Sequence, residues 1–293
     1  MKYVTFKIGS RISYGVVQGQ RVLDLAPLLG QRVPDLKSLI TQDLHATAAE
    51  LAARRNADFA LSEVELLPVI PNPGKIVCVG LNYRDHVSEV QRDVTESPTL
   101  FLRVPSSQVG HGQDIILPPE SDRLDYEGEV AIVIGTGGRR ITQDRAWDHI
   151  AGYACYNEGS VRDWQTATPQ WTAGKNFWRS GSFGPWMVSA DEIAPGQVMT
   201  LVTRLNGTEM QRATTDLMIH SIPRQIAYIS TFMPLEPGDV IVTGTPGGIG
   251  ARRTPPVFMK AGDVVEVEVD TVGVLRNRVV AESVQALAGG AGV

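Results

Sequence analysis

The chain has 293 residues, of which 43% are hydrophobic and 20% charged, a balance typical of a globular protein with a sizeable core. A formal net charge of −5 and the lack of any lysine- and arginine-rich run argue against a nucleic-acid-binding protein. No stretch reaches the ~18 apolar residues of a membrane span, and the N-terminus lacks the apolar segment of a signal peptide. We therefore expect a cytoplasmic protein that binds neither nucleic acid nor membranes.

Residues 1–67 read as short strands and one mostly helical segment. The strand-like stretches are "KYVTFKI", "SYGVVQ" and "RVLDLA", and the helical one is "LKSLITQDLHATAAELAARRNADFALSE". The proline-rich stretch "LLPVIPNPGKI" follows and is typical of a boundary. We therefore predict a small N-terminal α/β domain over residues 1–70 and a second domain over residues 71–293.

The second part of the chain is rich in predicted strands. The apolar strand "IVCVG" precedes one or two helical turns in "LNYRDHVSEVQ", and "DRAWDHIAGYACYNEG" predicts a helix followed by a strand. A further helix is predicted in "SIPRQIAYISTFM". In "DVVEVEVDTVGVLRNRVV", alternation with a period of two predicts buried valines and exposed glutamates. These patterns indicate a β-rich α+β architecture.

Two cysteines occur, Cys78 and Cys155, and both have apolar neighbours. Such a pair does not make a disulfide framework, so we expect two buried free thiols in a reducing compartment.

The stretch "LDYEGEVAIVIG" places two glutamates in front of an apolar run. Side chains at positions i and i+2 of a strand share a face, so Glu127 and Glu129 should stand about 7 Å apart at Cα. A divalent cation would let both stay ionised despite their repulsion, and an all-oxygen ligand set suits Mg²⁺ or Mn²⁺. The alternative is a pair that is exposed or bound to arginines, which is common for this spacing.

A third carboxylate, Glu158, ends the apolar strand of "GYACYNEGSVRDW" directly before a glycine. Arg162 follows four residues later, and Lys175 lies further along in "TAGKNFW". Three carboxylates and two cations suit a site for a metal and an anionic ligand. An ordinary surface turn is the alternative.

His86 and Glu89 lie three residues apart in "GLNYRDHVSEV" and share a face if this segment is helical. A carboxylate beside an imidazole fixes its tautomer and raises its basicity, as a general base acting on water requires. The same spacing occurs far more often in solvated surface pairs. The other histidines lack such a partner and are predicted to be structural or surface residues: His45, His111, His149 and His220.

The glycine-rich stretch "VTGTPGGIG", residues 242–250, does not predict a phosphate-binding loop. Such a loop needs a helix directly after it, and "ARRTPPVF" contains two prolines. A turn whose backbone and threonine hydroxyls approach a small ligand fits better. The chain also lacks a G-x-S-x-G motif and a Cys/His cluster, which argues against a serine nucleophile and a zinc site.

Five stretches, in order along residues 73–280, resemble the fumarylacetoacetate hydrolase family: "VGLNYRDHVSE", "DYEGEVAIVIG", "IAGYACYNEGSVRDWQ", "GKNF" and "LEPGDVIVTGTPGGIG". The chain is most similar to members that hydrolyse acylpyruvates. The resemblance implies a mixed β-sandwich roll behind a small N-terminal domain, a homodimer, and a site for Mg²⁺ or Mn²⁺.

The resemblance also implies roles for individual residues. The metal ligands would be Glu127, Glu129 and Glu158. The family's third ligand is normally aspartate, so Glu158 would bind either directly or through a water. The catalytic residues would be His86, Glu89 and Lys175, and the substrate-binding residues would be Arg162, Gln165, Thr245 and Asn82.

Members of the family act on 2-oxo acids that carry a second carbonyl group. We therefore expect a C–C bond hydrolase that cleaves a 2,4-dioxo acid, either an acylpyruvate or a sugar-derived 2,4-diketo-3-deoxy acid, into pyruvate and a carboxylic acid. His86, oriented by Glu89, would deprotonate the attacking water, and the metal would stabilise the enolate of pyruvate. The alternatives are an oxaloacetate decarboxylase, a hydratase or isomerase of a 2-oxo acid, and a binding protein without catalysis.

Two segments are expected to shape the substrate site. Residues 81–97 are predicted to form a mobile lid that becomes ordered when a ligand binds. The stretch "WQTATPQWTAGKNFW" is predicted to line part of the pocket wall.

Overall fold

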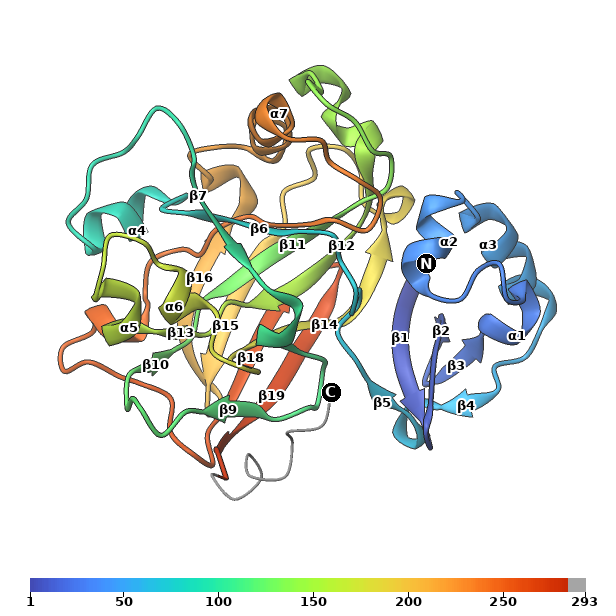
Figure 1. The fold of residues 1–293 in the computed structure, drawn as a ribbon, viewed down its shortest axis with the longest axis horizontal. Helices are drawn as coiled ribbons and strands as arrows, with labels where there is room; N and C mark the ends of the chain where they lie inside the picture. Colours follow the sequence, from blue (N-terminus) through green and yellow to red (C-terminus); the bar gives the residue numbers. More distant parts are fainter. Residues whose placement is uncertain (284–293) are drawn as a thin grey trace.

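The computed structural model describes residues 1–283 of the chain and is β-rich with few helices, as predicted. Figure 1 shows a large β-rich body with a smaller N-terminal unit beside it. None of the described helices combines the length and the apolar character that crossing a membrane requires.

The N-terminal unit combines five short strands with three helices and one 3₁₀ turn. Its elements are β1 (Lys2–Ile8), β2 (Arg11–Gln18), β3 (Arg21–Asp24), α1 (Ala26–Leu29), α2 (Leu36–Thr41), α3 (His45–Arg54), β4 (Phe59–Ala60), η1 (Leu61–Glu63) and β5 (Glu65–Leu66). The Asp35 side chain caps α2 by accepting a hydrogen bond from the Ser38 amide. The predicted helical segment is split in two because Asp43 takes a left-handed conformation, with φ of 51°.

A 12-stranded mixed sheet runs through both the N-terminal unit and the body. Its order is β4-β3-β2-β1 followed by β14 (Gly181–Ser189), β12 (Ile150–Asn157), β11 (Gly128–Ile134), β17 (Val240–Val242), β6 (Ile76–Gly80) and β7 (Thr99–Arg103), with β5 on β1 and β8 (Gln108–Val109) on β14. Because β1 pairs with β14, one sheet joins the two parts. The division into two domains at residue 70 therefore stays a prediction.

Two smaller sheets complete the body. The five-stranded sheet has the order β16 (Thr208–Thr214), β15 (Thr200–Leu205), β18 (Val264–Val269), β19 (Gly273–Ala281) and β9 (Ile115–Leu117). The two-stranded sheet consists of β10 (Leu124–Asp125) and β13 (Ser160–Val161). In β18, Val265, Val267 and Val269 are buried and the glutamates between them are half-buried, which agrees with the predicted alternation.

Strand β11 is buried along its whole length because both of its faces are covered. Val130, Ile132 and Ile134 belong to the core shared with the five-stranded sheet, whose members include Val267 and Leu275. Ala131 and Val133 belong instead to the core shared with the N-terminal helices. Full burial of a valine or isoleucine stabilises a fold by about 1.5–3 kcal/mol, so this strand is a rigid support for the residues at its start.

The remaining helices and turns cover the edges of the sheets. They are α4 (Arg84–Glu89), η2 (Pro105–Ser107), η3 (Gln143–His149), α5 (Arg162–Thr166), α6 (Thr172–Lys175), η4 (Ala190–Glu192), η5 (Thr215–Leu217), α7 (Ile222–Phe232) and η6 (Gly250–Arg252). The predicted helices before Ile150 and over the segment that begins at Ser221 are thus present, the first as a 3₁₀ helix. Both cysteines are buried free thiols, as predicted.

Candidate active site and metal centre

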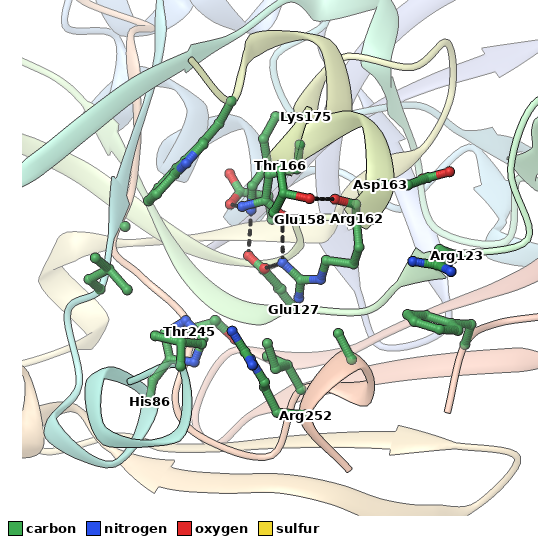
Figure 2. A pocket seen from close by; sticks show the side chains of 18 of the residues that line it. His86, Arg123, Glu127, Glu158, Arg162, Asp163, Thr166, Lys175, Thr245 and Arg252 are labelled. Atoms are coloured by element: carbon green, nitrogen blue, oxygen red, sulfur yellow. Dashed lines mark hydrogen bonds and ion pairs between the residues drawn. The ribbon is translucent and has the colours of Figure 1, made fainter. Parts of the chain in front are cut away.

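A cavity of about 630 Å³ opens between α4, α5, α6 and the turn after β17. Its wall includes apolar side chains such as Val79, Trp171 and Phe258. Figure 2 shows its charged side chains converging from these elements. Eight of the ten predicted site residues line it: His86, Glu127, Glu129, Glu158, Arg162, Gln165, Lys175 and Thr245.

The register between β11 and β12 explains how carboxylates from distant segments meet. These strands pair antiparallel with Gly128 opposite Asn157, so the residues flanking this pair come together at one end of the sheet. The Glu158 amide donates a hydrogen bond of 2.8 Å to the Glu127 carbonyl, which fixes this junction. Glu127 thus lies just before β11, and Glu158 lies just after β12.

The three glutamates form a buried cluster. Their side chains offer one oxygen each within 4.8 Å of one another. Glu127, Glu129 and Glu158 have relative exposures of only 4%, 1% and 2%. This arrangement agrees with the predicted ligand set and excludes the alternative of glutamates exposed to solvent.

Two cations bind the cluster from one side. The Lys175 ammonium lies 2.7 Å from Glu127 Oε2 and 2.7 Å from Glu158 Oε2. The Arg162 Nη1 atom lies 2.5 Å from Glu127 Oε1 (Figure 2). Burial raises the pKa of Glu127, but the charges of Lys175 and Arg162 outweigh burial and hold that pKa below its usual range.

The surroundings of Glu129 and Glu158 favour the charged carboxylate less than those of Glu127 do. Burial and then the charges of Glu158 and Glu127 raise the pKa of Glu129 well above its ordinary value. Burial also raises the pKa of Glu158, and the Lys175 charge only partly opposes this. The Lys175 charge and then a backbone hydrogen bond from Gly244 partly oppose the rise for Glu129. The repulsion is the kind that a bound divalent cation removes.

The residues present fit a hard divalent cation. Glu158 Oε1 is buried and accepts no hydrogen bond from residues 1–283, so one ligand oxygen is left without a partner. Within residues 1–283, the buried carboxylates of Asp125, Glu127, Glu129 and Glu158 form ion pairs only with Arg162 and Lys175, and these six groups together carry a formal charge of minus two. Carboxylate oxygens are the ligands that Mg²⁺ and Mn²⁺ prefer. Whether Glu158 binds directly or through a water stays a prediction.

The predicted histidine–glutamate dyad is present on α4. His86 Nδ1 lies 3.4 Å from Glu89 Oε2, and His86 lines the cavity while being only 6% exposed. Glu89 also accepts hydrogen bonds of 3.1 and 3.2 Å from the Gly248 amide. The glycine-rich turn after β17 therefore holds the dyad in place, instead of binding a phosphate. It also carries Thr245, whose hydroxyl donates to the Gly128 carbonyl at 3.0 Å.

The structure does not bring Asn82 into the cavity. Its side chain is fully buried and donates to the carbonyls of His220 and Thr243 at 3.1 and 2.7 Å, and it accepts from the His220 amide. All of its hydrogen-bonding groups are thus used to fix the segment between β6 and α4, which makes Asn82 a positioning residue. The four histidines predicted to be structural do not line the cavity.

One more of the predicted contacts is modified by the structure. Gln165 lines the cavity, but its Oε1 atom accepts a hydrogen bond of 2.8 Å from Arg162 Nη1. It therefore orients the arginine as well as facing the cavity. Thr166 and Trp171 of the predicted wall segment also line the cavity.

Asp125 is a site residue that the sequence reasoning missed. It is fully buried, and its Oδ2 atom lies 2.8 Å from both Nε and Nη2 of Arg162. Its two oxygens also accept hydrogen bonds of 2.9 Å from the amides of Gly250 and Ala251. Asp125 therefore ties α5 to η6 across the cavity. The sequence signal that could have found Asp125 is its position two residues before Glu127, which places both side chains on the same face of an extended chain.

Replacing Asp125 by asparagine is expected to lower the free energy of unfolding by about 3 kcal/mol, since it leaves a buried guanidinium short of a charged partner. Chemical denaturation measures this difference. Asp163→Asn is the matched control, because Asp163 lies on the same helix as Arg162 and, among residues 1–283, its side chain accepts hydrogen bonds only from Ser121 and a neighbouring amide. Equal losses for both variants would contradict the assigned role of Asp125.

The comparison with protein families identifies the family to which this fold belongs. Residues 75–280 match the model of the fumarylacetoacetate (FAA) hydrolase C-terminal domain. The chain belongs to the fumarylacetoacetate hydrolase family. The predicted family resemblance is thereby confirmed, and membership in this family supports an enzyme.

Two similar proteins are named as oxaloacetate tautomerases. The chain is 39% identical over 255 residues to a mitochondrial oxaloacetate tautomerase of Homo sapiens, which covers 84% of this chain and 81% of the relative. It is 35% identical over 302 residues to the oxaloacetate tautomerase YisK of Bacillus subtilis, which covers 95% and 100%.

A solved structure is similar over nearly the whole chain. The maleylpyruvate hydrolase of Sphingobium sp. SYK-6, in complex with manganese(II) and pyruvate, superposes with a TM-score of 0.81. The two chains are 28% identical, and the match covers 97% of this chain and 100% of the hydrolase. With the buried glutamate cluster, this relative supports Mg²⁺ or Mn²⁺ as the cofactor of the family member described here.

Proposed function

We propose that this enzyme is a tautomerase that interconverts the keto and enol forms of oxaloacetate, with Mg²⁺ or Mn²⁺ as its cofactor. The observation that carries the proposal is that His86, held by Glu89, faces the same cavity as the glutamate cluster and its two cations. A 2-oxo acid bound in that cavity would lie within reach of an acid–base group. Proton transfer alone is enough for tautomerisation.

The chain's own residues would bind the substrate and move the proton. Arg162 and Lys175 are buried cations beside the cluster and would attract the carboxylate of a 2-oxo acid. His86 is held through Nδ1, so Nε2 is the atom that would take a proton from C3 of the substrate. The electron pair of the broken C–H bond then forms the C2–C3 double bond, the 2-oxygen takes a proton from water to give the enol, and His86 returns its proton to water. A bound divalent cation would polarise the 2-oxo group and so make the C3 proton more acidic.

This proposal replaces the acylpyruvate hydrolase as the preferred activity. Both reactions use a base beside a chelated 2-oxo acid, but hydrolysis also needs an ordered water aimed at a distal carbonyl. The relatives that cover most of the chain at 35–39% identity are named for oxaloacetate tautomerisation. The expectation of a reaction on oxaloacetate through an enolate therefore has better support than C–C hydrolysis.

Product identification separates the candidate reactions. The protein is incubated with oxaloacetate and with acetylpyruvate, each with Mn²⁺ or Mg²⁺, and the products are assigned by NMR. A tautomerase speeds exchange between the enol and keto signals of oxaloacetate and forms no new carbon skeleton. Release of pyruvate and carbon dioxide would point to a decarboxylase, and acetate from acetylpyruvate would point to the hydrolase.

A homodimer and a cytoplasmic location remain predictions. The edge strand β7 and the neighbouring loops expose Leu102, Val104 and Trp178 at 54%, 46% and 52%. The Asn176 side chain bonds to the backbone of Leu102 and Val104, so these residues form one surface beside the active site. A second copy of the chain would suit this apolar surface.

A further inference from the structure

The active-site cavity contains three arginines that the reaction described above does not use. Arg92, Arg123 and Arg252 all line it. Arg123 lies 3.9 Å from Asp122, and both of these side chains are largely exposed, so this pair is weak. Arg92 and Arg252 make no side-chain ion pair or hydrogen bond within residues 1–283. The outer part of the cavity thus carries positive charge that is free to meet a ligand.

Arg252 is the best positioned of the three. It ends η6, whose first two amides donate to the buried Asp125 carboxylate. The next residue, Arg253, is fixed by bonds to the Met210 carbonyl and the Tyr126 hydroxyl. The backbone is therefore held on both sides of Arg252, and Figure 2 shows its side chain extending into the cavity. A held backbone lowers the entropy cost of using such a side chain for binding.

The inner cations are already paired with carboxylates of the protein. Arg162 is bound to Asp125 and Glu127, and Lys175 is bound to Glu127 and Glu158. These groups, the ionised Glu129 and a divalent cation together have no net formal charge. The carboxylate next to the 2-oxo group would belong at this inner centre. A carboxylate at the far end of the substrate would need a cation elsewhere in the same cavity.

We propose that the Arg252 guanidinium binds the second carboxylate of a 2-oxo dicarboxylate and so gives the enzyme its preference for dicarboxylic substrates. The planar guanidinium matches a carboxylate through two parallel hydrogen bonds. This inference rests on the proposed function, because oxaloacetate is a 2-oxo dicarboxylate. It assigns the recognition of the second carboxylate to a residue outside the inner centre.

Binding of two stable analogues tests this assignment without turnover. Oxalylglycine carries a distal carboxylate, and oxamate has the same 2-oxo acid head without it. Both are titrated calorimetrically into the Mg²⁺-loaded protein, for the wild type and for Arg252→Gln, Arg252→Lys and Arg139→Gln. Arg139 is exposed and does not line the cavity, so its variant controls for the loss of one surface charge. Arg252 is also exposed, so its variants should fold normally.

The wild type should bind oxalylglycine more tightly than oxamate, and Arg252→Gln should lower that ratio of affinities by about tenfold, as expected for loss of a charge-assisted hydrogen bond. Arg252→Lys should keep part of the ratio, and Arg139→Gln should keep all of it. An equal ratio in the wild type and Arg252→Gln, or no preference in the wild type, would overturn the assignment.

Activity on oxaloacetate is measured in parallel on the wild type. A wild type that discriminates the analogues through Arg252 but does not turn over oxaloacetate would overturn the proposed function and leave the carboxylate site standing. If the wild type turned over oxaloacetate but Arg252→Gln left the ratio of affinities unchanged, the proposed function would stand and the role assigned to Arg252 would be overturned.

Discussion

Replacing His86 by alanine is expected to lower kcat on oxaloacetate at least ~100-fold, the usual contribution of a positioned general base. The side chain is held by Glu89 and lines the cavity, but it makes no ion pair with the glutamate cluster. Affinity for Mn²⁺ should therefore stay within about twofold of the wild type. Stopped-flow kinetics give kcat, and calorimetric titration gives the metal affinity.

His149→Ala is the matched control for this loss. His149 does not line the cavity, and its Nδ1 atom contacts the Thr136 carbonyl at 2.7 Å. Its replacement should leave kcat unchanged. A His86→Ala enzyme with near-wild-type turnover would remove the dyad from the mechanism.

Replacing Glu129 by glutamine is expected to weaken Mn²⁺ and Mg²⁺ binding by at least about tenfold, since one anionic ligand becomes neutral. The effect on the metal-free protein should have the opposite sign. Burial and then the charges of Glu158 and Glu127 raise the pKa of Glu129, so a neutral amide avoids the cost of a buried negative charge at this position. The metal-free variant should melt no lower than the wild type, but it should gain less stability when metal is added.

Glu120→Gln is the control for the metal experiment, because Glu120 is exposed and does not line the cavity. Calorimetric titration and thermal melting with and without a chelator measure both effects. If Glu129→Gln bound metal as tightly as Glu120→Gln, the glutamate cluster would not be the metal centre.

The glutamate cluster was predictable from the sequence because its members are either close neighbours in the chain or lie at the end of a predicted strand. The two-residue spacing of Glu127 and Glu129 defines one strand face, and Glu158 ends a second apolar strand. The dyad was predictable because His86 and Glu89 lie one helical turn apart on α4. In each case a period of the backbone fixed which side chains share a face.

The residues that were missed or misplaced depend on contacts between distant segments. Asp125 gains its importance from pairing of β10 with β13 and from the amides of η6, and neither contact has a local signal. Asn82 lies inside a recognised motif, but packing against His220 and Thr243 turns its side chain away from the cavity. Arg252 is an exposed arginine in a turn, a pattern too common to predict a site.

We propose that this chain uses a divalent cation and His86 to interconvert the enol and keto forms of oxaloacetate. The initial rate at which enol-oxaloacetate is lost, followed by ultraviolet absorbance with Mn²⁺ and after chelation, tests this proposal. We expect the wild type to accelerate this loss well above buffer with Mn²⁺, and expect the acceleration to disappear on chelation and in His86→Ala. A rate equal to that of buffer with Mn²⁺ present, or an acceleration that survives both chelation and the loss of His86, would contradict the claim.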